Sequence, residues 1–188
     1  MSIIAKLSLD EYERIVASGV FDWPSARRIE LIRGELREMN PIGPDHAQIV
    51  DRLIRWSVRY LPEETARVRV QNPLAFANID SEPQPDIAWV KEKSYSRVHP
   101  TGADVLLVLE VADSSLERDR TEKADLYAEV GIQEYWIVNL IDHAIEVYRD
   151  PAAGHYRSVQ SLAADEMARP LAVPEAGLSF NRLLLPPG

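Results

Sequence analysis

Two acidic residues stand beside short apolar runs that are typical of buried strands. Asp86 follows Pro85 at the start of one run, and Glu110 lies inside LLVLEVA, the run from Leu106 to Ala112. An unpaired charge in an apolar site costs several kcal/mol or is neutralised by a pKa shift, so such an acid usually has a partner. If the two runs are neighbouring strands, both carboxylates can converge on one divalent cation, because Mg²⁺ is typically held by one or two carboxylates. The acid pair therefore predicts a Mg²⁺ or Mn²⁺ site.

Each acid also has an ordinary structural explanation. Asp86 can bond nearby backbone groups where its strand begins. Glu110 can point to a solvated face of the sheet or pair with an arginine. A shared cation explains both acids together, because it removes the like-charge repulsion that would raise their pKa values. The sequence leaves both explanations open.

A lysine and a histidine add basic groups to the predicted site. Lys123 lies four residues before Tyr127 on the helix expected after Glu110, so both side chains lie on one helix face. That face packs toward the sheet, where the lysine would steady an attacking water or a phosphoryl charge; alternatively, its head reaches solvent while its stem packs. His46, in the first turn of an expected helix, could orient a nucleophile or contact a phosphate, or could simply be a surface or capping residue.

Glu30 is a further candidate for the site. It lies in the run IELI at residues 29–32, the first strand of an expected hairpin. Its carboxylate could extend the acidic cluster. It could equally pair with Arg28, Arg33 or Arg37 across the hairpin.

The elements that must position these residues follow from periodicity and turn signals. Ser8 and Glu11 form a capping box that opens a helix, and Asp45 is expected to cap a longer helix that ends near Leu61. A helix from Asp119 or Thr121 is expected to end at Val130. The predicted strands are 29–32, 35–39, 66–77, 86–90, 105–112, 134–140, 144–149 and 155–162. This order predicts a mixed α/β fold, with helices packed on a mixed sheet and additional hairpins.

Composition limits the class of protein. The 188 residues suit a single domain, and the absence of cysteine excludes thiolate chemistry and disulfides. No apolar run approaches the roughly 20 residues that a membrane helix needs, so we expect a cytoplasmic protein without a membrane partner. The net charge of −9 argues against a general polyanion binder. No glycine-rich phosphate loop, Gly-x-Ser-x-Gly elbow or His-Glu-x-x-His motif occurs, which disfavours P-loop NTPases, serine hydrolases and zincins.

Seven segments in their order resemble the Uma2 family, which belongs to the restriction-endonuclease-like PD-(D/E)XK superfamily. They are IELIRGEL, GPDHAQIV, VQNPL, SEPQPDIAWV, DVLLVLEVADSS, the Lys123 to Tyr127 pair and GIQEYWIVNL. The resemblance covers about residues 29–150 and implies one nuclease-type domain over residues 1–188. It also implies a Mg²⁺-dependent or Mn²⁺-dependent site that acts on DNA, and nucleases of this kind often form homodimers.

The resemblance assigns the motif residues and shows one departure. Pro85 and Asp86 match its first half, and Glu110 to Ala112 match the second. Ala112 occupies the place of the usual lysine, and Lys123 on the following helix resembles a migrated substitute.

Three hypotheses follow for the function. The first is a metal-dependent endonuclease with Asp86 and Glu110 as metal ligands, Lys123 and His46 as further catalytic residues, and Glu30 and Tyr127 shaping the site. The second is a catalytically weak or inactive binding or assembly module, suggested by Ala112 and the net charge of −9. The third is a hydrolase of a smaller phosphate ester.

Overall fold

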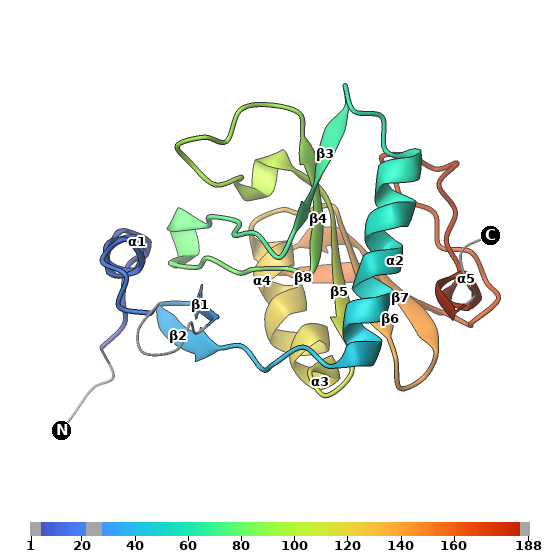
Figure 1. The fold of residues 1–188 in the computed structure, drawn as a ribbon, viewed down its shortest axis with the longest axis horizontal. Coiled ribbons are helices and arrows are strands. Elements are labelled where there is room, and N and C mark those ends of the chain that lie inside the picture. The colour runs from blue at the N-terminus through green and yellow to red at the C-terminus, as the bar shows by residue number, and fades with distance from the viewer. Residues whose placement is uncertain (1–4, 22–27, 185–188) are drawn as a thin grey trace.

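A six-stranded mixed sheet forms the centre of the structure, a computed structural model that describes residues 5–21 and 28–184 (Figure 1). Its strands follow one another in sequence order across the sheet. Only β5 and β6 run parallel, because a helical segment crosses between them; every other neighbouring pair is antiparallel. The strands are β3 (Ala66–Val70), β4 (Ile87–Lys91), β5 (Val105–Ala112), β6 (Glu134–Asn139), β7 (Ala144–Ala152) and β8 (His155–Leu162).

The predicted mixed α/β fold is confirmed, with a helical layer on each face of this sheet (Figure 1). Because side chains alternate along a strand, β5 sends Leu107, Leu109 and Val111 to one core and Val108 and Ala112 to the other. The strand is buried along nearly its whole length, which is why its sequence reads as a continuous apolar run.

The helix α2 (Pro44–Tyr60) covers one face of the sheet (Figure 1). Trp56 on this helix stacks on Trp89 of β4, with ring centroids 5.0 Å apart. The C-terminal helix α5 (Phe180–Leu184) joins the same core. The prediction that Asp45 caps α2 is wrong, because Gly43 is the N-cap and Pro44 begins the helix. Proline suits this first position, since the N–H that it lacks would have no partner within the helix.

The opposite face is covered by a continuous helical segment of three parts. These are α3 (Leu116–Arg118), the π-helical turn η3 (Asp119–Lys123) and α4 (Ala124–Glu129). The helix therefore starts earlier than the predicted Asp119 or Thr121. The Ser115 hydroxyl, just before it, donates to Oδ2 of Asp119 at 2.6 Å, so both ends of this first turn are tied together.

The N-terminal elements form a smaller layer beside the main sheet (Figure 1). They are α1 (Leu9–Ala17), with the predicted capping box, and the antiparallel pair β1 (Ile29–Ile32) and β2 (Glu35–Glu38). Arg33 and Gly34 between these strands both have positive φ, as a tight hairpin turn requires. Glu82 attaches the pair to the body of the protein through its N–H, which donates to the carbonyl of Leu31 at 2.7 Å.

The strand predicted over 66–77 is shorter in the structure. It ends at Val70 because Gln71 adopts a φ of 49° and Pro73 has no N–H for the ladder. Short 3₁₀ turns follow at η1 (Ala77–Ile79) and η2 (Gly102–Asp104). Within residues 5–21 and 28–184, no helix has the length and apolarity to cross a bilayer.

Candidate active site

Asp86 and Glu110 lie side by side because β4 and β5 are antiparallel neighbours, with Ile87 opposite Leu109. The N–H of Asp86 donates to Oε2 of Glu110 at 3.3 Å, and the N–H of Val111 donates to Oδ2 of Asp86 at 2.9 Å. Both acids are buried, with exposed fractions of 6% and 4%. The expectation that the two runs are adjacent strands is therefore confirmed.

Lys123 and Tyr127 both reach the same oxygen of Glu110. The ammonium of Lys123 lies 2.7 Å from Oε1, and the Tyr127 hydroxyl donates to Oε1 at 2.9 Å. This is possible because Glu110 points toward the helical segment η3–α4, on the same side of β5 as Ala112. Lys123 is buried, so the alternative in which its head reaches solvent is wrong.

Burial and charge set the protonation of this pair. Burial raises the pKa of Glu110, the Lys123 charge opposes that rise, and Asp86 adds to it. Burial alone would lower the pKa of Lys123, but the nearby carboxylates of Glu110, Glu30 and Asp119 hold it above its usual range. The lysine therefore stays protonated and supplies a fixed positive charge beside the acids.

Asp86 has a different environment from Glu110. Burial tends to raise its pKa, but the hydrogen bond and charge of His46, the Val111 N–H and the charge of Lys123 lower it overall. His46 on α2 places Nε2 at 3.0 Å from Oδ1 of Asp86, and the Gln71 amide donates to that oxygen at 3.2 Å. Although burial lowers the pKa of His46, its bond to Asp86 raises it overall. His46 is thus an orienting partner of Asp86.

Asp119 also belongs to the site, although the sequence analysis predicted it only as a possible first residue of a helix. It is 2% exposed, and its Oδ1 lies 4.0 Å from the ammonium of Lys123. Burial raises its pKa, which the Lys123 charge and the Ser115 hydrogen bond oppose. Its spacing of four residues from Lys123 was the available signal, since that spacing puts both side chains on one helix face.

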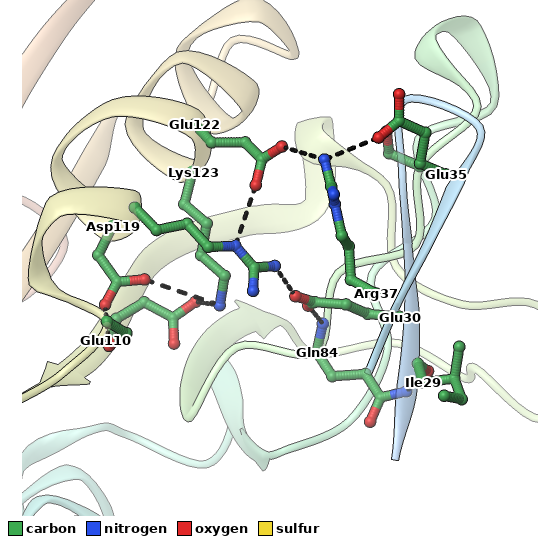
Figure 2. A network of polar contacts seen from close by, with 12 residues as sticks. Ile29, Glu30, Glu35, Arg37, Gln84, Glu110, Asp119, Glu122 and Lys123 are labelled. Carbon is green, nitrogen blue, oxygen red and sulfur yellow. Dashed lines mark hydrogen bonds and ion pairs between the residues drawn. The ribbon is translucent and has the colours of Figure 1, made fainter. Parts of the chain in front are cut away.

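Glu30 pairs with Arg118 instead of the hairpin arginines named as alternatives. It also accepts the N–H of Gln84 at 3.3 Å, and Arg118 holds Glu122 at 2.9 Å. Figure 2 shows how this network joins the β1–β2 pair to the helix that carries Lys123. Glu30 therefore anchors the wall of the site and acts on Lys123 through its charge.

A cavity of about 360 Å³ opens over these groups. Its lining includes Asp86, Glu110 and Lys123, together with residues 39–46 before and within α2 and residues 113–115 after β5. Arg28 also lines it, and its Nη2 is buried without a hydrogen-bond partner among the described residues. In the described part of the chain, no group of three or more acidic, histidine or cysteine side chains is arranged to hold a metal ion. Asp86 and Glu110 remain the candidate ligands that the sequence analysis named.

Comparisons with known proteins agree with this fold. A crystal structure of "a putative nuclease belonging to DUF820" from Anabaena variabilis superimposes with a TM-score of 0.72 at 17% sequence identity. The match covers 94% of this chain and 97% of that chain, so the similarity shows a shared fold. No match was found among curated proteins.

The sequence model of one family matches residues 9–182, which is nearly the whole chain. Its description is "Putative restriction endonuclease". The predicted restriction-endonuclease-like fold is confirmed by this match together with the fold comparison. The chain belongs to the Uma2 family, and its fold is restriction-endonuclease-like.

Proposed function

We propose that this protein is a metal-dependent endonuclease that hydrolyses DNA phosphodiester bonds. The observation that carries the proposal is the convergence of Asp86, Glu110 and the protonated Lys123 in one cavity. The family supplies the class of reaction, and the acid pair with its lysine supplies groups suited to phosphodiester hydrolysis.

The donor atoms fit a hard divalent cation. Oδ2 of Asp86 and Oε2 of Glu110 each accept one hydrogen bond from a backbone N–H of the described chain. A carboxylate oxygen has about two lone-pair sites, so each of these oxygens retains one for a metal. Mg²⁺ or Mn²⁺ suits this set, because such ions take one or two carboxylates and complete their shell with water and phosphate oxygens.

The charges of the side chains that line the cavity also favour binding of a cation. Six acidic side chains line it against three arginine or lysine side chains and one histidine, so the formal charge of the lining is negative when every acid is ionised. A DNA phosphate entering this cavity without a counterion would be repelled. The acidic residues are Glu30, Asp45, Asp86, Glu110, Asp113 and Asp119, and the basic ones are Arg28, Arg118 and Lys123.

Each side chain then has a defined role. A metal held by Asp86 and Glu110 would polarise the scissile phosphate and lower the pKa of a bound water. Lys123 supplies positive charge where negative charge develops on the attacked phosphate. His46 orients Asp86, and Tyr127 fixes the rotamer of Glu110 through its hydrogen bond.

Plasmid cleavage tests the proposal directly. Purified protein with Mg²⁺ or Mn²⁺ is expected to nick or linearise supercoiled DNA, and Asp86→Ala and Glu110→Ala are expected to abolish cutting. Glu117→Gln is a matched control, because Glu117 is an exposed acid outside the cavity. Cutting that persists in both alanine variants would identify a contaminant or another site.

A specific observation favours the second hypothesis, a catalytically weak binding or assembly module. The Lys123 ammonium is already engaged by Glu110, and Ala112 leaves β5 without a lysine of its own. Retarded migration of DNA in gels without cleavage over hours, in the presence of Mg²⁺, would support a binding module.

The third hypothesis, a hydrolase of a smaller phosphate ester, has its own test. Hydrolysis of bis(p-nitrophenyl) phosphate without cleavage of DNA would support it.

A further inference from the structure

A second groove lies apart from the catalytic cavity and shares none of its lining residues. It has a volume of about 1150 Å³ and lies between α1, η1, the loop at 95–103 and the end of α4. Much of its wall is apolar. The aliphatic residues and the phenylalanine that line it are Val16, Ala17, Ala75, Phe76, Ala77, Val98, Ala103 and Val130.

Glu82 places a carboxylate in this apolar groove. The residue is 4% exposed, and within the part of the chain that the structure describes no hydrogen bond reaches its buried Oε2. The neighbouring charge that acts on it is Glu13, which has the same sign and also lines the groove. A buried acid without a partner is costly, and native structures rarely retain one without a purpose. The missing partner is a hydrogen-bond donor or a cation.

The wall of the groove is held in place before any ligand arrives. Gly102 approaches α4 so closely that a Cβ there would lie 2.5 Å from the carbonyl oxygen of Val130. Next to it, the N–H of Thr101 donates to Oδ2 of Asp104 at 2.9 Å and closes the η2 turn. A pre-formed wall lowers the ordering cost of binding.

We propose that this groove binds a small organic cation whose planar amidinium or guanidinium head donates two hydrogen bonds to Glu82. A carboxylate accepts such a head through two parallel N–H···O bonds, which are stronger than neutral hydrogen bonds. The apolar body of the ligand packs against Phe76, Val98 and Val130. Glu13, Glu82 and Glu129 line the groove against Arg97 and His99, and burial holds the pKa of His99 below its usual range, so the acids outweigh the bases and favour a cation. The site is independent of the proposed nuclease activity.

Titration with benzamidinium chloride tests the site on the full chain at pH 8. We expect saturable binding by calorimetry, and a dissociation constant at least about tenfold higher in Glu82→Gln, since the charged bidentate contact is lost. Neutral benzamide should bind at least about tenfold more weakly than benzamidinium to the unaltered protein. Glu129→Gln is the matched control, because Glu129 lines the groove but already pairs with Arg33 at 2.6 Å. Its affinity should equal that of the unaltered protein.

A second variant keeps the test decisive if Glu82→Gln does not fold. Ala17 is an exposed lining residue at the end of α1, so Ala17→Trp obstructs the groove while leaving Glu82 in place. We expect this variant to weaken benzamidinium binding as well. Absence of saturable binding, equal binding of benzamide, or unchanged affinity in Glu82→Gln or Ala17→Trp would overturn the proposal.

Discussion

The ammonium of Lys123 lies 2.7 Å from Oε1 of Glu110, although one residue comes from a helix and the other from a strand. β5 turns Glu110 and Ala112 toward η3, and the π-helical turn carries Lys123 into the space over them. The result is a buried ion pair whose cation comes from outside the strand. A lysine at residue 112 is therefore unnecessary for a positive charge beside Glu110.

Removing this cation should slow the proposed reaction. We expect Lys123→Ala to reduce the initial rate of plasmid cleavage by about 100-fold, the usual loss when one preorganised charge-stabilising group is removed. Lys93→Ala is the control, because Lys93 pairs with Asp104 and lies outside the cavity. An equal loss in both variants would show that the effect is not specific to the site.

A lysine placed on the strand should restore part of the lost rate. Ala112 faces the same side of β5 as Glu110, so the double variant Lys123→Ala/Ala112→Lys returns an ammonium to the space that Lys123 vacates. Crowding in the core argues for partial recovery only. Circular dichroism must show native secondary structure before the rate is compared. A folded double variant as slow as Lys123→Ala would refute the equivalence of the two positions.

Neutralising Glu110 should lower the proposed metal affinity. We expect calorimetric titration with Mn²⁺ to give one site per chain, and Glu110→Gln to weaken binding by about tenfold or more, since one of two anionic ligands becomes neutral. Glu117→Gln should bind as the unaltered protein does. Unchanged binding in Glu110→Gln would exclude this carboxylate as a ligand.

Arg28 offers the proposed substrate an unused donor. Arg28 lines the cavity, and its buried Nη2 has no hydrogen-bond partner among the described residues. We expect Arg28→Ala to raise the KM for DNA by about tenfold with little change in kcat, the pattern of a group that binds substrate and transition state alike. A fall in kcat at unchanged KM would instead place Arg28 in the chemical step.

The buried ion pair between Glu30 and Arg118 should stabilise the fold more than the exposed ion pairs of Arg37 do. Glu30 is 1% exposed, so Arg118→Ala leaves a buried carboxylate without its cation and should cost about 1–3 kcal/mol. Arg37→Ala removes more exposed ion pairs with Glu35 and Glu122 and should cost below about 1 kcal/mol. Urea unfolding measures both values.

A double variant distinguishes the cost of leaving the Glu30 carboxylate unpaired from the cost of losing the Arg118 side chain. Glu30→Gln/Arg118→Ala should be more stable than Arg118→Ala alone, because no unpaired carboxylate remains buried. The opposite order would mean that the buried charge of Glu30 is not what makes the loss of Arg118 costly.

Glu82 should make stability depend on pH. Burial, and then Glu13, raises its pKa from 4.5 to about 7 in the folded protein. The folded state therefore binds more protons than the unfolded state between these values, and this residue destabilises the fold increasingly as pH rises through that window.

The variant Glu82→Gln removes this effect. We expect it to exceed the unaltered protein in unfolding free energy by about 1–2 kcal/mol at pH 8, with the difference shrinking toward pH 4.5. Urea unfolding across this range measures it, and Glu129→Gln should show no such trend because Glu129 is exposed and paired. If the difference in unfolding free energy between Glu82→Gln and the unaltered protein were the same at all pH values, Glu82 would not be the source of the pH dependence.

Periodicity and turn signals predicted most of the elements, because these properties are local. The capping box at Ser8 and the turn signals between neighbouring strands each depend on residues only a few positions apart. Element ends were less predictable. The π-helical turn at Asp119–Lys123 arises where the segment packs on the sheet, and nothing in its own spacing indicates it.

The sequence by itself determined which residue types stand where: two acids beside apolar runs and a lysine one turn before Tyr127. Only the tertiary structure decided their partners, because ion pairs between distant segments depend on how the sheet and helices pack. Glu30 lies close in sequence to Arg28, Arg33 and Arg37, yet packing brings Arg118 to it from 88 residues away. The spacing of four residues already puts Asp119 beside Lys123, but the two side chains become buried only when η3 packs against the sheet.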